Sequence, residues 1–196
     1  MTRNVILVGE TGSGKSSIIN MISGDVVAPI SGTTGTRICS AYPTSIGEFA
    51  YNLYDTPGLD SNALRLGTDK VTKLIRDMHD GVNSLVFCMQ GNITDDTFAI
   101  YKHFSRLVKV PVIAVITGLE QEDPMEASWT KNGAALKEYG MSFADTACVT
   151  TLRGKRSIFA TQYDESKNNV RNLIAAHCLL NGQRAVSSCS VSTSTC

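Results

Sequence analysis

The sequence lacks an excess of charge of either sign. Its 18 Lys and Arg residues balance 18 Asp and Glu residues, and the formal net charge is +0. A protein whose main partner is a nucleic acid or another polyanion usually carries a surplus of positive charge. The balance therefore argues against a general nucleic-acid binder, although it does not exclude a local basic patch.

Long apolar runs are also missing. No stretch of the sequence approaches the roughly 18 consecutive apolar residues that a transmembrane helix needs. The short apolar run from Val5 to Val8 ends at Gly9, so it does not form a secretory signal peptide either. We expect no signal peptide and no transmembrane segment, whereas peripheral membrane association remains open.

The cysteines and histidines form no metal-binding pattern. The 6 cysteines contain no C-x-x-C pair and the 3 histidines are scattered, so no zinc site or thioredoxin-type motif is predicted. Cys39, Cys88 and Cys148 lie in apolar, strand-like runs, where a free thiol acts as a small core residue. Together with the nucleotide motif described next, the free thiols favour a reducing, cytoplasmic location.

The most specific feature that is present lies close to the N-terminus. The segment Gly9-Glu10-Thr11-Gly12-Ser13-Gly14-Lys15-Ser16 matches the phosphate-binding pattern G-x-x-x-x-G-K-[ST] at every fixed position. It follows the strand-like run Val5 to Val8 and precedes a run from Ser17 that is typical of a helix. This strand, turn and helix context predicts that the chain binds a nucleoside triphosphate and Mg²⁺.

Each part of the motif has a chemical task. Gly12 and Gly14 let the backbone approach the phosphates closely, so that the N–H groups of the loop form a nest for the anion. Lys15 reaches the β- and γ-phosphate oxygens and neutralises charge during catalysis, while the Ser16 hydroxyl coordinates Mg²⁺. We assign nucleotide binding to Gly9, Glu10, Thr11, Gly12, Ser13, Gly14, Lys15, Ser16 and Ser17.

A second motif follows another strand-like run. The run Phe49 to Tyr54 leads into Asp55-Thr56-Pro57-Gly58. A carboxylate at the end of such a strand lies opposite the phosphate loop, so Asp55 is expected to hold Mg²⁺, usually through water. The N–H of Gly58 is then available to a γ-phosphate oxygen, and this contact is lost when that phosphate leaves.

A threonine between the two motifs is expected to complete the metal site. The polar segment Ser31-Gly32-Thr33-Thr34-Gly35-Thr36 offers three candidates. We place Thr34 first and Thr33 second as a Mg²⁺ ligand that orders this loop in the triphosphate state, and we count Thr34 with Lys15 as catalytic. The spacing alone does not separate these candidates from a polar loop without such a role.

Strand and helix signals alternate along most of the chain. Strands are expected at 4–8, 37–42, 49–54, 84–89, 110–116 and 146–149, and helices at 15–22, 68–78, 94–107, 125–138 and 166–180. This order predicts an α/β fold with a mostly parallel central sheet and helices on both faces. The second and third strands are separated only by residues 43–48, so they should form an antiparallel hairpin at one edge. We expect one domain over residues 1–180 and a disordered, Ser/Thr-rich tail over 181–196.

Over roughly residues 1–150 the chain resembles the immunity-associated GTPases of the GIMAP type. The phosphate loop with its continuation Ser17-Ile18-Ile19-Asn20, and Asp55-Thr56-Pro57-Gly58, carry most of this resemblance. The plastid import receptors of the Toc type and the septins look like more distant relatives. The resemblance implies a Ras-like P-loop G domain, GTP or GDP with Mg²⁺ as ligands, and nucleotide-dependent homodimers.

The segment that should read the base departs from the guanine motif N-K-x-D. After the strand 110–116 the chain has Thr117-Gly118-Leu119-Glu120. Glu120 stands at the acid position and could accept from the N1–H and N2 amino groups of guanine, whereas Gly118 replaces the lysine. We count Thr117 and Glu120 as nucleotide-binding residues, and the segment Cys148 to Thr151 is a weaker candidate for a base-contacting loop.

The residue after Gly58 is Leu59, where a Ras-type enzyme has the glutamine that orients water. We therefore expect slow intrinsic GTP hydrolysis, about 10⁻⁴–10⁻² s⁻¹, that is accelerated by a partner or by a second copy of the chain. The leading hypothesis is a GTP-binding switch. The alternatives are a nucleotide-dependent assembly module with incidental turnover, and a P-loop ATPase.

Overall fold

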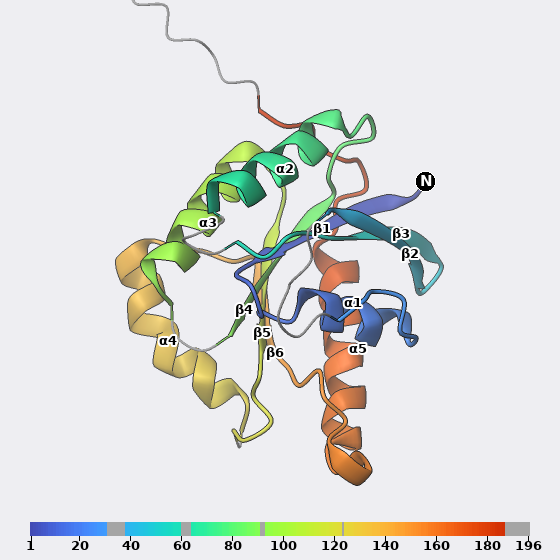
Figure 1. Ribbon diagram of the computed structural model, residues 1–196, viewed down its shortest axis with the longest axis vertical. Helices are drawn as coiled ribbons and strands as arrows, with labels where there is room; N and C mark the ends of the chain where they lie inside the picture. Colours follow the sequence, from blue (N-terminus) through green and yellow to red (C-terminus); the bar gives the residue numbers. More distant parts are fainter. Residues whose placement is uncertain (31–37, 60–63, 91–92, 123, 187–196) are drawn as a thin grey trace, which may run out of the picture.

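The computed structural model describes residues 1–30, 38–59, 64–90, 93–122 and 124–186, and the description below concerns these residues (Figure 1). In chain order the elements are β1 (Arg3–Gly9), α1 (Lys15–Ser23), β2 (Ser40–Ile46), β3 (Phe49–Asp55), α2 (Leu64–Asp77), β4 (Ser84–Gln90), α3 (Asp95–Leu107), β5 (Val112–Thr117), α4 (Glu126–Tyr139), β6 (Asp145–Cys148) and α5 (Ala160–His177), with a short 3₁₀ turn at Lys155–Ser157 before α5.

The strands form one sheet in the order β2-β3-β1-β4-β5-β6. All neighbouring pairs are parallel except β2 and β3, which are antiparallel at one edge. The expected α/β fold, with one antiparallel edge strand, is therefore confirmed. All seven residues of β1 are buried, as is usual for a central strand covered on both faces.

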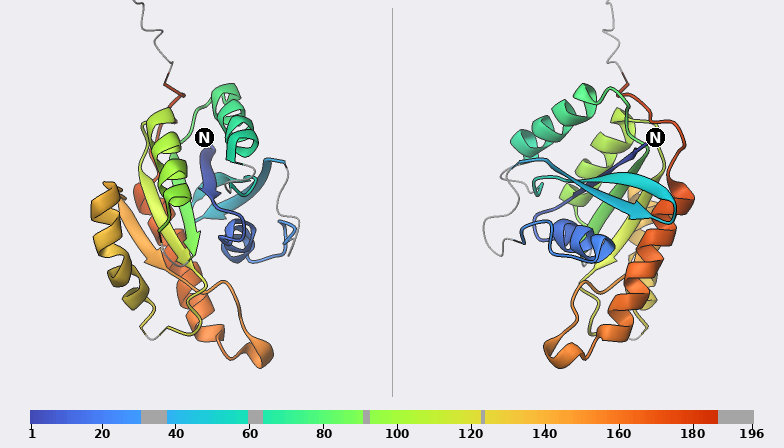
Figure 2. Two further views of the ribbon diagram at one scale, coloured as in Figure 1. Left: turned by 60° about the vertical axis from the view of Figure 1, so that its left-hand side comes forward. Right: turned by 90° about the vertical axis from the view of Figure 1, so that its right-hand side faces the viewer.

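Helices cover both faces of the sheet (Figure 2). On one face Ile18 and Ile22 of α1 and Val170 and Ile174 of α5 pack into one core with inward residues of the strands. On the other face a second core includes side chains from three helices, namely Val71 and Ile75 of α2, Ile100 and Phe104 of α3, and Leu136 of α4. The central strands alternate between these two cores, which fixes their register because a one-residue slip would exchange the faces.

The edge hairpin is tighter than the sequence suggests. We expected a loop from residue 43 to residue 48, but β2 continues through Pro43 to Ile46, and only Gly47 and Glu48 form the turn. Gly47 has φ 59°, which a glycine accepts without strain. Pro43 is tolerated because β2 is an edge strand, where a missing N–H need not remove a ladder hydrogen bond.

The chain after α5 returns to the sheet. Gln183 forms an antiparallel bridge with Val82, just before β4. The N–H of Val186 donates to the carbonyl of Leu107 at the end of α3 over 2.7 Å. The described chain therefore stays attached past residue 180, and the expected boundary between domain and tail stays a prediction. Within the described residues no helix combines the length and apolar character needed to cross a membrane.

Candidate functional site

The phosphate loop lies where β1 ends and α1 begins. At Gly9 the backbone has φ 152°, and a Cβ there would lie 2.1 Å from the carbonyl oxygen of Cys88 on β4. Gly14 has φ 84° and is the N-cap of α1. Because the helix begins with a glycine, no capping side chain covers the N–H groups of its first turn, and these groups can bind an anion.

Lys15 is held inside this loop. It is only 6% exposed, and its Nζ donates to the carbonyls of Gly9 over 3.0 Å and Glu10 over 2.8 Å. Burial lowers the pKa of Lys15, while the neighbouring Cys88, Asp55 and Glu10 act in the opposite direction. Its Nζ also lies 3.4 Å from the Ser13 hydroxyl, so these partners are all neutral. A buried ammonium with neutral partners gains most from an anion brought to it, because charge-assisted hydrogen bonds are the stronger kind.

Ser16 and Asp55 meet at the same end of the loop. The Ser16 hydroxyl donates to Oδ2 of Asp55 over 2.6 Å, and Asp55 is only 1% exposed. A hydroxyl and a carboxylate side by side are hard oxygen ligands, and Mg²⁺ usually takes few protein ligands while it keeps several waters and phosphate oxygens. The two residues therefore fit the metal that the motifs imply.

The segment after β3 is fixed against the phosphate loop. Thr56 is fully buried, and its hydroxyl donates to the carbonyl of Leu7 over 2.6 Å. Gly58 touches Thr11, because a Cβ on Gly58 would lie 2.3 Å from the Thr11 Oγ1. The N–H of Leu59 donates to the carbonyl of Gly9 over 3.2 Å. Consequently the two phosphate motifs, whose nearest residues Ser16 and Asp55 are 39 positions apart in sequence, lie against each other.

Glu10 connects the phosphate loop to α3. The helix begins with a capping box in which Thr94 and Thr97 exchange hydrogen bonds. The Thr97 hydroxyl also donates to Oε1 of Glu10, and the Thr94 hydroxyl lies 3.4 Å from the same atom. The Glu10 carboxylate is therefore engaged on the side of α3, a contact that the sequence motif does not reveal.

Thr117 lies beneath the phosphate loop. It is 3% exposed, and its hydroxyl donates to the carbonyl of Ser13 over 3.2 Å. A Cβ on Gly14 would lie 3.0 Å from the Thr117 methyl carbon. Thr117 thus supports the loop from below, and its expected contact with nucleotide stays a prediction.

Glu120 meets the loop that follows β6. The hydroxyl of Thr150 donates to Oε1 of Glu120 over 2.8 Å. Thr150 is only 1% exposed, its N–H donates to Ser166 of α5, and its Oγ1 accepts from the N–H of Leu152. A buried, well-anchored hydroxyl therefore orients the carboxylate that stands at the acid position of the base motif.

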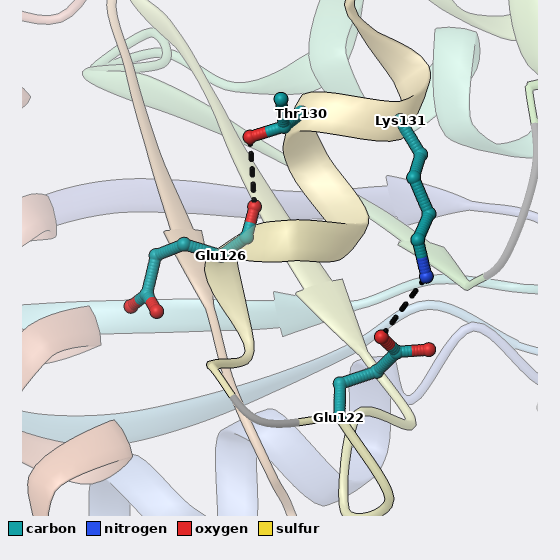
Figure 3. Close-up of polar contacts among 4 residues, drawn as sticks. All are labelled: Glu122, Glu126, Thr130 and Lys131. Atoms are coloured by element: carbon teal, nitrogen blue, oxygen red, sulfur yellow. Dashed lines mark hydrogen bonds and ion pairs between the residues drawn. The ribbon is translucent and has the colours of Figure 1, made fainter.

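The rest of the Glu120 loop is attached to α4. The N–H of Glu122 donates to the carbonyl of Leu119 over 3.0 Å, which closes a turn. Figure 3 shows Lys131 of α4 reaching Glu122 of this loop, with 3.1 Å between Nζ and Oε2. Exposed ion pairs of this kind contribute little to stability, so the buried Thr150 contact is the stronger restraint on Glu120.

Ser17 lines a separate cavity of about 410 Å³ beside the loop. Its wall comes from α1, the segment 24–30, the loop after β6 and the start of α5, and it includes Val26, Ile30 and Leu152. These three apolar side chains are 85%, 62% and 57% exposed. The expected phosphate contact of Ser17 stays a prediction.

The structure thus brings together most of the residues that the sequence selected. Ser16 and Asp55 meet, as do Gly58 and the phosphate loop. Thr33 and Thr34 lie outside the described residues, so the predicted metal ligand at Thr34 stays a prediction. The Thr97 contact with Glu10 was not predicted, because the helix-capping pattern at Thr94 and Thr97 gives no sign of it. Thr150 was predicted only weakly, as part of the segment Cys148 to Thr151.

Comparison with protein families gives one match. Residues 4–118, more than half of the chain, match the model of a family described as 50S ribosome-binding GTPase. The match covers both phosphate motifs and reaches Gly118 in the base-reading segment. No curated protein matches the sequence.

Solved structures of GTPases share the fold. Era from Aquifex aeolicus, bound to GDP and AlF₄⁻, aligns with a TM-score of 0.69 and 20% identity, covering 91% of this chain and 57% of that chain. Toc33 from Arabidopsis thaliana with Mg²⁺ and GMPPNP aligns with a TM-score of 0.58 and 12% identity, covering 94% and 88%. A further structure, whose title states that dimerization is important for the GTPase activity of atToc33 and psToc159, aligns with a TM-score of 0.61 and 14% identity. The alignment covers 95% of this chain and 86% of that chain. At these identities the likeness concerns the fold, and this chain spans little more than half of the Era length.

Proposed function

The chain belongs to the P-loop GTPase family described as 50S ribosome-binding GTPase, and on this premise we propose that it is a GTP-binding switch that hydrolyses GTP slowly with Mg²⁺. The observation that carries the proposal is the Ser16–Asp55 pair, 2.6 Å apart, beside the phosphate loop. It joins the two proposed metal ligands to the segment that ends in Gly58, whose N–H we expect to contact a terminal phosphate.

Mg²⁺ would be held by Ser16 and Asp55 together with the predicted Thr34. When bound, the ion neutralises charge on the β- and γ-phosphate oxygens. The chain itself supplies Lys15, the N–H groups of the loop and the open first turn of α1 as further positive groups. These features support a site that binds a triphosphate tightly.

Guanine is the base that the Glu120 geometry favours. A carboxylate accepts from both N1–H and the N2 amino group of guanine, whereas adenine presents the lone pair of its N1 at that edge. Thr150 holds one carboxylate oxygen at 2.8 Å, which reduces the entropy lost when the base binds. Pairing with guanine is therefore expected to be favourable, and adenine would leave the half-buried Glu120 carboxylate poorly paired.

Slow hydrolysis is supported by the position of Leu59. Its apolar side chain is fully buried in the second core, with Val71 and Ile75. A side chain that could orient water is therefore missing at this position. We expect unassisted turnover of about 10⁻⁴–10⁻² s⁻¹.

A nucleotide-dependent homodimer is the form in which we propose that turnover is accelerated. Large apolar side chains are exposed near the nucleotide face, among them Val26, Ile30, Ile38, Leu66 and Leu152, each between 57% and 85% exposed. Ile38 lies two residues before Ser40, which pairs with Asp55. An exposed apolar surface of this kind commonly marks a protein interface. For the Toc proteins a structure title states that dimerization is important for GTPase activity.

The same surface favours the second candidate, an assembly module in which GTP stabilises an oligomer and turnover is incidental. Neither candidate requires a nucleic acid, which agrees with the expectation drawn from the balanced charge. For Era, one structure contains nucleotides of 16S ribosomal RNA, and that partner is a property of Era. With its core thiols, we place this chain in the cytoplasm.

The deciding experiment compares the binding of fluorescent GTP and ATP, with Mg²⁺ and with EDTA. We expect Mg²⁺-dependent binding that favours GTP, and a preference for ATP would overturn the base assignment in favour of the ATPase.

Turnover per molecule is then measured across protein concentration and should rise with concentration. A flat profile would exclude the homodimer. Sizing with GDP and with a non-hydrolysable GTP analogue separates the switch from the assembly module, because only the assembly module needs to remain oligomeric throughout turnover.

A further inference from the structure

A cavity of about 540 Å³ lies between α2, α3 and the segment after α5. Figure 1 shows the two helices side by side over one face of the sheet. Thr72 of α2 is hydrogen-bonded to His103 of α3, with 2.9 Å between Oγ1 and Nε2. The third wall is fixed as well, because the N–H of Val186 donates to the carbonyl of Leu107 over 2.7 Å. These bonds join the walls to one another, so the cavity is preformed.

The charged side chains that line this cavity are all positive. Arg76 comes from α2, Lys102 and Arg106 come from α3, and no acidic residue of the described chain lines the cavity. Lys102 and Arg106 are four positions apart on a helix, so they share one face and repel each other. The whole chain has a formal net charge of +0, so this surplus is local. We call the cavity with its three cations the basic groove.

The two arginines of the basic groove have no carboxylate partner within the described part of the chain. Both are exposed, each in the last turn of its helix. Burial lowers the pKa of His103 in the same groove, Asp69 acts in the opposite direction, and Arg76 lowers it again. A ligand that brings negative charge would therefore relieve repulsion that the groove contains without it.

The rest of the lining is apolar and indicates what kind of anion fits. Ala99, Leu107 and Val186 line the groove between the cations. A small inorganic anion would pair with the cations and leave these side chains uncovered, whereas an acidic peptide segment can use both parts. Arginines beside apolar side chains are also typical of protein interfaces. Residues 181–196 of this chain contain no Asp or Glu, so their side chains do not complement the groove in charge.

We propose that the basic groove is a docking site for an acidic segment of a partner protein. Its carboxylates pair with the groove cations, and an apolar side chain of the segment covers Leu107 and Val186. The groove is separate from the nucleotide site, because Arg106 lies roughly 14 Å along the axis of α3 from Thr97, the residue that contacts Glu10. Partner and nucleotide can therefore bind at the same time.

The test measures fluorescence anisotropy of a labelled Glu-Glu-Leu-Glu-Glu peptide with the untagged full chain. The companion peptides are Gln-Gln-Leu-Gln-Gln, which lacks the charge, and Glu-Glu-Gly-Glu-Glu, which lacks the apolar side chain. The variants are Arg76→Glu and Arg106→Glu. Lys137→Glu is the matched control, since Lys137 is likewise an exposed basic residue in the last turn of a helix, α4. All three variants change the net charge and the charge at a helix end equally.

We expect saturable binding of the Glu-Glu-Leu-Glu-Glu peptide that each arginine variant weakens about tenfold, because charge reversal replaces an attraction by a repulsion. Lys137→Glu should remain within about threefold of wild type. The glycine peptide should bind about 3- to 10-fold more weakly, and the glutamine peptide should not bind. Arg106→Gln, checked by circular dichroism, keeps the test valid if a reversed charge prevents folding, and it should weaken binding about threefold.

Several outcomes would overturn the proposal. One is the absence of binding at about 1 mM protein. Another is an equal loss in Lys137→Glu, or equal binding of the leucine and glycine peptides, since either would indicate general attraction to anions. Self-association of the wild type that Arg106→Glu abolishes, without peptide binding, would assign the groove to a second copy of the chain instead.

Discussion

The two ends of the nucleotide site are built differently. At the phosphate end, residues from β1, α1 and the segment after β3 are packed together, and backbone carbonyls accept most of the hydrogen bonds between them. At the proposed base end, we expect specificity to depend on the side chain of Glu120, which accepts a hydrogen bond from a second side chain, Thr150. Backbone contacts recognise phosphate and are indifferent to the base, whereas the base is distinguished by a few replaceable side chains. Affinity and specificity should therefore respond to different mutations.

The largest effect is expected from Lys15→Ala at the phosphate end. Hydrogen bonds to charged groups contribute about 1.5–3 kcal/mol each, so loss of two phosphate contacts should weaken binding by about 100-fold or more. Because phosphate is common to both nucleotides, GTP and ATP should be affected equally. Fluorescence titration of both nucleotides measures this, with circular dichroism as a check of folding.

Lys131→Ala is the control for that variant, because Lys131 makes an exposed ion pair with Glu122. Its affinity for both nucleotides should equal that of wild type. A Lys15→Ala variant that lost GTP binding but kept ATP binding would contradict the proposed difference between the two ends, because the phosphate end would then distinguish GTP from ATP.

A smaller and selective effect is expected from Glu120→Gln. Replacing the carboxylate by an amide exchanges one acceptor oxygen for an NH₂ donor. GTP affinity should therefore fall about 10- to 100-fold, whereas ATP affinity should change less than about threefold. The ratio of the two dissociation constants is the measurement. Glu122→Gln on the same loop is the matched control and should leave the ratio unchanged; an equal fall for both nucleotides would show that Glu120 supports the fold instead.

Thr150→Val should have a smaller effect on the same ratio. It removes the hydrogen bond to Glu120 while it leaves the carboxylate, so GTP selectivity should fall about 3- to 10-fold, which corresponds to about 1 kcal/mol. Unfolding by urea should also show a loss of about 1–3 kcal/mol, because Thr150 is buried and its Oγ1 accepts from the N–H of Leu152. Thr151→Val, one residue further and only half-buried, is the control. Loss of stability with unchanged selectivity would remove Thr150 from the base site.

The smallest expected effect is a difference in chemical reactivity between two buried cysteine thiols, one near each end of the nucleotide site. Burial raises the pKa of Cys88, beneath the phosphate loop, to about 12, and that of Cys148, at the end of β6, to about 11. Only the thiolate reacts with iodoacetamide, so at pH 8–9 both thiols should react slowly, Cys148 about tenfold faster, with rates that rise as the pH rises. Mass spectrometry of native protein, with urea-unfolded protein as the reference, gives both rates. Equal rates would mean that the two ends are equally well packed.

The same contrast explains what could be predicted from the sequence. The phosphate loop is contiguous, so its glycines, Lys15 and Ser16 can be located from spacing alone, and Asp55 follows from the strand before it. The six strands and five α-helices of the described residues follow from the alternation of apolar runs. The base end could not be predicted as well, because the Glu120–Thr150 contact joins residues that are 30 positions apart through the folding of β6.

Two differences between the predicted and the observed boundaries of secondary-structure elements have physical causes. The loop of the hairpin was expected to begin at Pro43, but an edge strand accepts a proline, and β2 continues to Ile46. Helix α5 was expected from Ser166 but begins at Ala160, because its first residues include the exposed polar pair Thr161 and Gln162 and carry no apolar period that would mark a helix. Contacts such as Glu10 with Thr97 depend on the packing of α3 beside the loop and leave no local pattern.

The attachment of the C-terminal segment has a practical consequence for experiments on this chain. The bridge between Val82 and Gln183 holds that segment beside the start of β4, while the phosphate loop follows the opposite end of the parallel strands. The start of β1 lies at the same end of the sheet as this bridge (Figure 1). An affinity tag, dye or surface tether placed after residue 186 should therefore leave the nucleotide face open to solution, so that immobilised protein can be used for binding measurements and for capture of a second copy.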